Sequence, residues 1–468
     1  MGRTITVDPA TRVEGHAKIL LDLDDNGNVR QGHLQVLEIR GFEKLMEKME
    51  LFKMPQIIAR ICGVCPTAQH LASVTAIENG LGINAPQEAK LLRELMYMGH
   101  ILHSHTLSTF FLAGPDIFKG IDAAAETKNI FALLNFDADL AKKALRLRSI
   151  GQRAVEIVGG RGVHPVTAIP GGISARPEKD KLEQIAAWGK EAIALLDEVL
   201  PQVRERIPSL EEIRRVAILP PHPMGLSNEG CVDFLAGEAV VMNDRNEPIR
   251  QFNASGYAEQ LVEHVMPISY MKTVRLRGNE ETSYFVGPLA RLNVNNRFNT
   301  SRATAALEEF QAKGRPCLSA VDYIEARVVE MLHCAERIID ITEKELSGGP
   351  LKVDAEPIEG RFKGMIEAPR GLLIHDYATD NEGRIREANL IVATQNNYDA
   401  IDSTITEVAR HLAPKNNDEL LMSGMEFTLR CFDPCLSCAT HTAGRMPMEV
   451  RFRQDGEVVR KISRRFAR

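Results

Sequence analysis

The sequence has no hydrophobic run long enough to cross a membrane, although 44% of its 468 residues are hydrophobic. A membrane-spanning helix needs about 20 consecutive apolar residues. The N-terminal stretch also lacks the basic start and the apolar core of an export signal. These absences predict a cytoplasmic protein without a direct membrane span, and the hydrophobic content is sufficient for a large core.

The sequence also lacks a large surplus of charge of either sign. The 57 lysine and arginine residues stand against 63 aspartate and glutamate residues, which leaves a net charge of −6. A chain that binds nucleic acid normally carries a basic surplus, because it must neutralise phosphates. The composition therefore excludes nucleic acid as an expected partner.

Cysteine is scarce, with eight residues in the whole chain, too few for a disulfide scaffold of this length. Four of them form two Cys-x-x-Cys pairs, and the others are scattered: Cys231, Cys317, Cys334 and Cys431. We expect most of these four to be buried as small hydrophobic side chains. The remaining cysteines cannot build a chain of iron–sulfur clusters, so electrons that leave this protein require a partner.

The two pairs, Cys62 with Cys65 and Cys435 with Cys438, predict one metal centre. The spacing lets two sulfurs converge on one ion, and four thiolates favour zinc, copper(I), iron–sulfur or a nickel–iron centre over magnesium or calcium. From spacing alone, a structural zinc site is an equally good interpretation. However, structural zinc knuckles usually lie within a few tens of residues of each other, whereas 370 positions separate Cys65 from Cys435. This separation favours a catalytic site assembled by the whole fold.

Hydrophobic periodicity predicts an α+β fold that is predominantly α, a bundle of long helices with small peripheral antiparallel sheets and the metal site between the two chain ends. The predicted strands are 4–8, 17–23, 29–39, 371–378 and 384–393. The predicted helices are 66–80, 87–118, 128–159, 178–206, 319–346 and 399–412. The mixed pattern of residues 208–300 predicts short strands and loops. Since ligands of one site come from both ends, we expect residues 1–441 to form one domain, followed by an extension at 442–468.

Further motifs accompany the cysteine pairs in the same order along the chain. The whole set comprises Arg12-Val13-Glu14-Gly15-His16, Arg40-Gly41-Phe42-Glu43, Arg60 to Cys65, Glu367-Ala368-Pro369-Arg370-Gly371, and Asp433 to His441. Together they resemble the signatures of the large, catalytic subunit of nickel–iron hydrogenases. The resemblance covers essentially the whole chain. It implies reversible heterolytic cleavage of H2 to protons and electrons.

The resemblance also implies a role for each cysteine. Cys65 and Cys438 would bridge nickel and iron, while Cys62 and Cys435 would bind nickel alone. Carbon monoxide and cyanide would complete the ligand set of the iron. No iron–sulfur cluster is expected in this chain.

Cys435 and three other side chains would serve the reaction by the same resemblance. Cys435 would accept the proton first, and Glu14 would relay it, since a buried carboxyl exchanges protons well near neutral pH. Arg370 would direct its guanidinium to the cyanide side of iron. Thr394 would donate its hydroxyl to a cyanide, although an ordinary backbone hydrogen bond in a strand is an equally good expectation.

A magnesium ion is implied at Glu43 and His441. Glu43 precedes Cys62 by nineteen residues, the spacing that the family uses for this ligand. Magnesium prefers oxygen ligands, so a carboxylate is expected there and a histidine is unusual. The histidine therefore depends on the resemblance alone.

Two positions depart from the common family pattern. Ser104 lies between His103 and His105, where many relatives have aspartate, and Gln69 stands where a histidine often follows the first cysteine pair. The first departure resembles the cytoplasmic, cofactor-coupled branch of NAD-reducing or methyl-viologen-reducing type. The roles of Gln69 and Ser104 stay open.

The resemblance implies several partners: an iron–sulfur small subunit, diaphorase or other flavoprotein subunits that pass electrons to a soluble acceptor such as NAD(P), and a maturation endopeptidase. The endopeptidase would cut after His441 and remove residues 442–468, which contain eight basic and three acidic residues. Two alternatives belong to other classes. One is a non-catalytic subunit similar to the quinone-site subunit of respiratory complex I, whose members lack these cysteines, and the other is a zinc-stabilised scaffold.

Overall fold

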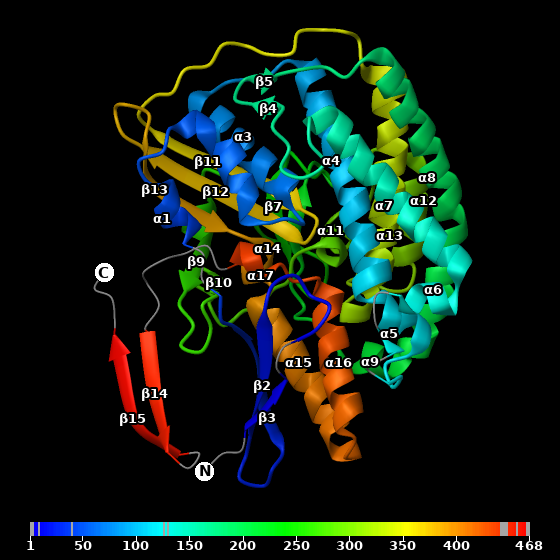
Figure 1. Ribbon diagram of the computed structural model, residues 1–468, viewed down its shortest axis with the longest axis vertical. Helices are drawn as coiled ribbons and strands as arrows, with labels where there is room; N and C mark the ends of the chain where they lie inside the picture. The colour runs from blue at the N-terminus through cyan, green and yellow to red at the C-terminus, as the bar shows by residue number, and fades with distance from the viewer. Residues whose placement is uncertain are drawn as a thin grey trace.

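Long helices form one side of the molecule (Figure 1). The structure is a computed structural model that describes residues 4–7, 10–38, 41–124, 127–128 and 131–439, together with the backbone of two later strands. The long helices are α4 (Gln87–Thr106), α7 (Ala138–Gly159), α8 (Lys179–Arg206) and α13 (Tyr323–Asp340). Helix α4 packs against α7 and α13, and α8 packs against α13. This arrangement confirms the predicted helix bundle.

Glycines allow these helices to approach closely. A Cβ atom added to Gly99 of α4 would lie 2.9 Å from the carbonyl oxygen of Gly151 in α7. A Cβ atom on Gly189 of α8 would lie 2.8 Å from Ile339. Since real Cβ contacts are longer than this, only glycine permits these helices to cross at their present distance.

The predicted helix limits are largely confirmed, with one clear error. The segment 178–206 is α8, and 319–346 is a 3-10 turn, then α13, then a π turn at Ile341–Glu345. The segment 87–118 is α4, a π-helical stretch (Leu107–Leu112) and α5 (Gly114–Lys119). The predicted start at 128 is wrong, because the carboxylate of Asp137 accepts hydrogen bonds from the amides of Asp139 and Leu140 and so caps α7 there.

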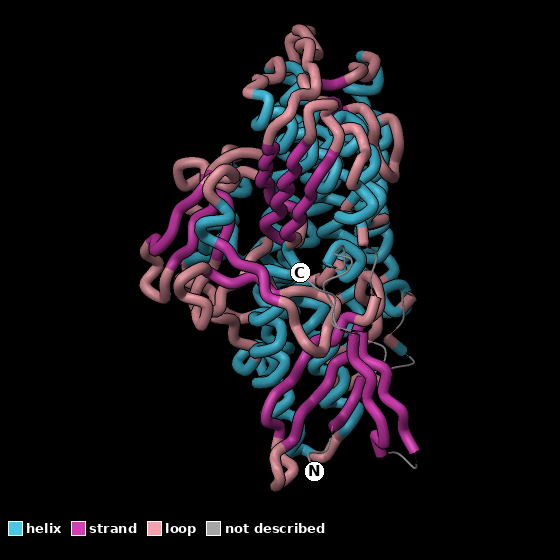
Figure 2. The backbone as a smooth tube through the Cα atoms, turned by 90° about the vertical axis from the view of Figure 1, so that its left-hand side faces the viewer, coloured by secondary structure: helices cyan, strands magenta, loops and turns pink. Residues whose placement is uncertain are grey.

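Small antiparallel sheets lie to one side of the bundle and below it, and Figure 2 shows their strands in magenta. Strands β1 (Thr4–Val7), β2 (Ala17–Leu23) and β3 (Val29–Val36) pair in that order, and β3 packs on α15 (Tyr398–Leu412). Strands β11 (Arg361–Ala368), β12 (Gly371–Thr379) and β13 (Ile385–Ile391) form another sheet. Every residue of β12 is buried, and α3 (Pro66–Leu81) packs against β11 and β12. The sequence prediction missed β11.

The segment 208–300 contains the short strands that were predicted, and α-helices besides. Its strands are β6 (Met224–Ser227), β7 (Glu238–Met242), β8 (Pro248–Phe252), β9 (Leu261–His264) and β10 (Thr273–Leu276), and its main helices are α9 (Glu211–Val216) and α11 (Pro288–Val294). The remaining elements include α1 (Phe42–Met46), α2 (Met54–Ile58), α6 (Ala132–Phe136), α10 (Tyr257–Gln260), α12 (Ser301–Gln311), α14 (Ala393–Asn396), α16 (Asp418–Phe432), α17 (Leu436–Ala439), β4 (Ala168–Ile169) and β5 (Gly172–Ile173).

Distant parts of the chain meet in the middle of the molecule. The main hydrophobic core includes residues from Ala10 to Ala439. Near the first sheet, Glu14 forms a parallel bridge with Cys435, and the amide of Leu436 donates to the carbonyl of Glu14 at 3.1 Å. Helix α17, which begins at Leu436, packs against α14 (Figure 1).

The later segment forms a separate hairpin, drawn in red in Figure 1. Its strands β14 (Met448–Gln454) and β15 (Glu457–Arg464) pair in antiparallel fashion.

In the described part of the chain, no helix has an apolar stretch sufficient to span a bilayer.

Candidate metal centre

The four predicted cysteines converge in the structure. Cys62 and Cys65 lie between the 3-10 turn at Ala59–Ile61 and the start of α3, while Cys435 and Cys438 lie at α17. Their sulfur atoms all lie within 4.8 Å of one another, and all four side chains are buried. The sequence prediction of a single four-sulfur cluster is therefore confirmed.

The sulfur distances fit a shared metal and exclude a disulfide. Cys65 and Cys438 are 3.0 Å apart, Cys435 and Cys438 are 3.0 Å apart, and Cys62 and Cys435 are 3.3 Å apart. A disulfide bond measures about 2.05 Å. Four thiolates about 2.3 Å from one tetrahedral ion would be separated by about 3.8 Å. To bind one metal ion, the four sulfur atoms therefore need to move only slightly apart.

Electrostatics also favour a cation among the sulfurs. Hydrogen bonds from the other thiols, led by Cys435, lower the pKa of Cys62 well below its ordinary value. Burial raises the pKa of Cys435 and Cys438 well above it. A buried site cannot hold several thiolates unless a positive charge compensates them, so these ligands and a metal ion require each other.

Glu14 directs its carboxylate to this cluster. Its Oε2 atom accepts a hydrogen bond from the amide of Ser437 at 2.9 Å and lies 3.3 Å from the Sγ of Cys435. Gly15 permits the close approach, because it has a positive φ of 84° and an added Cβ would lie 2.8 Å from the Cβ of Leu436. The structure thus brings a half-buried carboxylate within reach of one sulfur.

Arg370 lies on the other side of the cluster, in the turn between β11 and β12. Its Nε donates to the carbonyl of Asp433 at 2.6 Å, and its Nη2 donates to the Asp433 carboxylate at 2.9 Å. Burial alone would lower the pKa of Arg370, but Asp433 and the cysteines raise it well above its ordinary value. Its buried Nη1 has no hydrogen-bond partner among the described residues. A free donor beside a thiolate cluster fits an anionic metal ligand such as cyanide.

Thr394 lies in the short helix α14, not in a strand. Its Oγ1 accepts a hydrogen bond from the amide of Cys435 at 2.9 Å. The expected backbone contact is therefore present, and the hydroxyl proton can still be donated elsewhere. Glu43, in α1, is half-buried and accepts from the amide of Leu390 at 2.9 Å. The second predicted magnesium ligand, His441, lies outside the described residues.

The two departures from the family pattern have different surroundings. The Oε1 of Gln69 lies 2.8 Å from the Nε2 of His375, so its amide pairs with β12. Ser104 is buried in α4, and its hydroxyl has no partner among the described residues. The neighbouring His105 contacts Glu330 at 2.7 Å, and burial lowers its pKa to about 4.

The sequence did not reveal a buried charge cluster around Arg291 of α11. Its guanidinium makes ion pairs of 2.7 Å with Glu330 of α13 and with Glu367 of β11. It also donates to the carbonyls of Ala368 and Pro369 at 3.1 and 3.2 Å. These bonds hold the turn that carries Arg370. Two signals were available: Glu330 is a charged residue within the apolar pattern of a helix, and Glu367 belongs to the motif that contains Arg370.

The two carboxylates of this Arg291 cluster differ in pKa. Burial would raise the pKa of Glu330, but Arg291 overcomes this effect and lowers it to about 2. For Glu367, burial prevails and raises the pKa to about 7 despite the same arginine. The cluster therefore gains a negative charge as the pH rises through neutrality.

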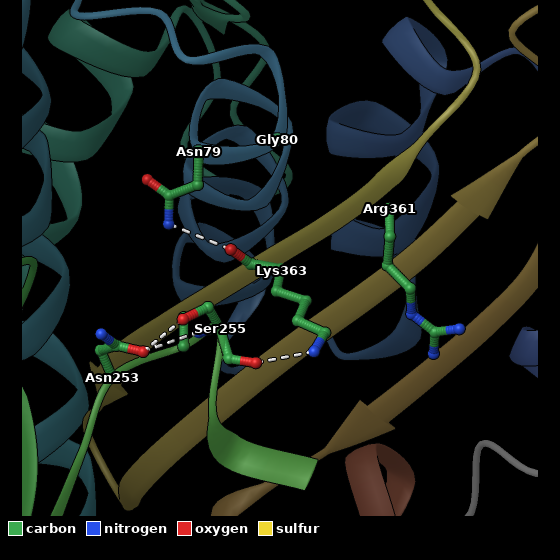
Figure 3. A pocket seen from close by; sticks show the side chains of 7 residues that line it. Asn79, Gly80, Asn253, Ser255, Arg361 and Lys363 are labelled. Carbon is green, nitrogen blue, oxygen red and sulfur yellow. Dashed lines mark hydrogen bonds between the residues drawn. The ribbon is translucent and has the colours of Figure 1, made fainter.

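A surface pocket of about 590 Å³ lies apart from the predicted site residues (Figure 3). It is lined by Asn79, Gly80, Asn253, Ala254, Ser255, Arg361 and Lys363. Lys363 already donates to the carbonyl of Ser255 at 2.7 Å, and Arg361 pairs with Asp376 at 2.7 Å. Arg361 is thus paired with a carboxylate, whereas the ammonium group of Lys363 donates to a neutral carbonyl and keeps its charge.

Comparison with known proteins gives consistent matches. A model of the nickel-dependent hydrogenase family matches residues 40–135 and 238–441, and a HoxL-like model matches residues 4–39. The vhc F420-non-reducing hydrogenase of Methanococcus voltae has a subunit that is 34% identical over 471 residues, which cover 98% of this chain and 99% of that protein. The NAD-reducing hydrogenase HoxS subunit beta of Cupriavidus necator is 32% identical over 478 residues, covering 96% and 97%.

Solved structures show the same similarity. A crystal structure of an NAD+-reducing [NiFe]-hydrogenase in the H2-reduced state superposes with a TM-score of 0.90 at 33% identity, covering 94% of this chain and 99% of that one. The Ni-Fe-Se hydrogenase from D. vulgaris Hildenborough in the reduced state gives a TM-score of 0.78 at 25% identity, covering 94% and 100%.

Proposed function

The chain belongs to the nickel-dependent hydrogenase family, as the large subunit of a [NiFe] hydrogenase, and on this premise we propose how its residues cleave H2 reversibly into protons and electrons. One observation carries the proposal. Four sulfur atoms within 4.8 Å of one another come from opposite ends of the chain, and a carboxylate lies 3.3 Å from one of them. A structural zinc site does not need such a carboxylate.

The four cysteines would hold a nickel–iron centre, with Cys65 and Cys438 shared by both metals and with Cys62 and Cys435 on nickel alone. When bound, the centre supplies the position at which H2 is polarised and its electrons are taken up. The protein supplies the ligands and a dry, fixed environment.

Proton transfer would begin at the Sγ of Cys435 and continue to Glu14. The carboxylate lies within reach of that sulfur, and the hydrogen bond from the amide of Ser437 keeps it oriented. A carboxyl group in such a position can accept a proton and release it again with little rearrangement. Glu14 is therefore the first relay on the route to solvent.

Arg370 and Thr394 would bind the cyanide ligands of iron. The unpartnered Nη1 of Arg370 and the hydroxyl of Thr394 both lie beside the cysteines. Since Asp433 holds the rest of the guanidinium, the free donor has a fixed direction. A magnesium ion would bind to Glu43 and His441. This ion would stabilise the C-terminal side of the metal centre.

Electrons would pass to the small, iron–sulfur subunit of the enzyme and then, through diaphorase or other flavoprotein subunits, to a soluble acceptor such as NAD(P). The names of the relatives, which include an NAD-reducing hydrogenase and describe subunits of larger enzymes, support this assignment. We place the protein in the cytoplasm, with residues 1–441 as one catalytic domain. A maturation endopeptidase would remove residues 442–468.

Matched cysteine variants test the metal centre. Cys435→Ser should abolish nickel binding and the infrared bands of metal-bound carbon monoxide and cyanide. Cys431→Ser, four residues earlier and buried outside the cluster, should retain both. Zinc in place of nickel in the purified wild-type complex, or full metal content in Cys435→Ser, would contradict the proposal.

Glu14→Gln tests the relay separately. The amide keeps the shape of the side chain but cannot carry the proton. The variant should retain nickel and the infrared bands and lose H2/D2O exchange by about a hundredfold or more. Exchange at the wild-type rate would remove Glu14 from the mechanism.

A further inference from the structure

A second buried charge cluster, separate from the sulfurs, surrounds Asp116 of α5. The carboxylate is fully buried and pairs with three cations. Arg12 and Arg430 each approach it to 2.8 Å, and Lys128 approaches it to 3.4 Å. Glu426 of α16 adds a further ion pair to Arg430, at 2.8 Å. The proposed reaction uses none of these side chains.

The two arginines of this Asp116 cluster belong to the segments that build the metal centre. Arg12 lies two residues before Glu14, and Arg430 lies five residues before Cys435. Arg430 also donates to the carbonyl and the hydroxyl of Thr11, at 2.9 and 2.8 Å. One carboxylate therefore ties the segment that carries Glu14 to the segment that carries its neighbouring sulfur.

The segment that carries Glu14 needs such support. Arg12 has a positive φ of 55°, which is unfavourable for a residue with a side chain. Beyond it, Gly15 also has a positive φ, of 84°. The N-terminal side of this bend is held by the ion pairs of Arg12 and the bonds to Thr11, and its other side is held by the bridge of Glu14 to Cys435. Removal of the first set leaves the strained backbone free to relax.

We propose that Asp116 is a positioning residue for proton transfer, because it holds Arg12 and Arg430 together and so sets the 3.3 Å distance between Glu14 and Cys435. It contacts neither of these two residues in the described structure. The inference rests on the proposed relay role of Glu14. A displacement of about 1 Å in a reacting group can slow a step about a hundredfold.

The charges of the cluster explain why the carboxylate is needed. Burial lowers the pKa of Arg12, Asp116 opposes this effect, and the charge of Arg430 adds to it. The two guanidinium groups thus repel each other wherever the carboxylate does not separate them. Neutral asparagine at position 116 would leave Glu426, which pairs with Arg430, as the remaining carboxylate that offsets this repulsion. Arg12, which is 15% exposed, then keeps its hydrogen bond to the carbonyl of Leu112 but loses the ion pair that holds it inward, so it can turn toward solvent and draw Glu14 with it.

The test compares Asp116→Asn with a control in the assembled enzyme. The variant should keep the infrared bands of bound carbon monoxide and cyanide, while H2/D2O exchange per nickel falls about tenfold to a hundredfold. Its solvent isotope effect on H2 oxidation should rise, since proton transfer then limits the rate. Asp402→Asn, which changes another buried aspartate, on α15, should leave exchange per nickel and the isotope effect unchanged.

A double-variant cycle separates this inference from the relay proposal. Asp116→Asn combined with Glu14→Gln should exchange no more slowly than Glu14→Gln alone, because both changes act on one step. If Glu14→Gln slows exchange but Asp116→Asn does not, the positioning role is wrong and the relay stands. If Glu14→Gln exchanges normally, both are wrong.

A second variant covers the case in which Asp116→Asn does not fold. Arg12→Gln leaves the 2.8 Å pair of Asp116 and Arg430 intact and removes the ion pair that links Asp116 to the segment of Glu14, together with the bond from Arg12 to the carbonyl of Leu112. It should reproduce the slower exchange and the larger isotope effect at full nickel content. Normal exchange per nickel in Arg12→Gln would overturn the inference.

Discussion

The two buried charge clusters beside the metal centre have opposite compositions. Around Arg291, one cation faces two carboxylates, and all three side chains are fully buried. Around Asp116, three cations face that carboxylate and the partly exposed Glu426. The first cluster is therefore negative when both of its carboxylates are ionised, and the second is positive.

Each cluster supports a side chain of the opposite charge for which we propose a role in the reaction. The Arg291 cluster holds the turn that carries the cation Arg370, and the Asp116 cluster holds the segment that carries the carboxylate Glu14. The net charge of each cluster is thus opposite in sign to the charge of the side chain whose backbone segment the cluster holds. The attraction between them favours a position of that side chain close to the cluster. The difference shows that these clusters support function through their sign as well as through their rigidity.

The largest effect is expected from Arg291→Met. Two carboxylates would be left in the core without a cation, and the turn of Arg370 would lose two hydrogen bonds. The free energy of unfolding should fall by about 3–5 kcal/mol, and nickel per chain should fall with it. Denaturant unfolding and metal analysis measure the two effects.

Two further variants show whether charge is the cause. Adding Glu330→Gln and Glu367→Gln to Arg291→Met should recover much of the stability, because the buried charges are then gone. Arg302→Met breaks an exposed pair with Asp197 and should cost less than about 1 kcal/mol. Similar losses in Arg291→Met and Arg302→Met would remove the distinction between the buried cluster and an ordinary surface pair.

An intermediate effect is expected from pH, through Glu367. Burial raises its pKa from an ordinary value of 4.5 to about 7, so the folded chain binds a proton that the unfolded chain releases. Stability should therefore fall as the pH rises from about 4.5 through 7. Glu367→Gln should flatten this slope, as seen in unfolding temperatures at pH 5.5 and 8. Equal slopes in both proteins would show that Glu367 is ionised throughout this range and that the cluster has a constant charge.

The smallest effect is expected from Lys128→Met. Asp116 keeps two arginines at 2.8 Å, so its negative charge stays compensated after the loss of the lysine. Unfolding free energy should change by about 1 kcal/mol or less, mainly because Ser423 and the carbonyl of Ile121 lose a donor. A loss as large as that of Arg291→Met would mean that all three cations are required and that the cluster has no surplus.

Sequence reasoning found what contiguous motifs encode. The cysteine pairs lie in short segments whose spacing specifies a metal site, so their convergence could be predicted although 370 positions separate them. Helix α8 was predicted within one residue because its amphipathic pattern is long. Helix α16 was missed, although Asn417 precedes it and its side chain accepts from the amide of Leu420 as a helix cap.

The two charge clusters could not be predicted in this way. Arg12 and Asp116 are 104 positions apart, and Arg430 and Asp116 are 314 apart. Each is a single charged residue whose burial depends on packing of the complete fold. A charged residue in a sequence normally indicates a solvated surface, so the exceptions become visible only in three dimensions.

The bridge between Glu14 and Cys435 has a consequence for biosynthesis. The ribosome completes Cys62 and Cys65 some 370 residues before it reaches Cys435, an interval of on the order of half a minute at ordinary elongation rates. Throughout that interval the first two thiols have no matching pair. Cofactor insertion must therefore follow translation of nearly the entire polypeptide, and the nascent chain must keep these sulfurs reduced and available until then.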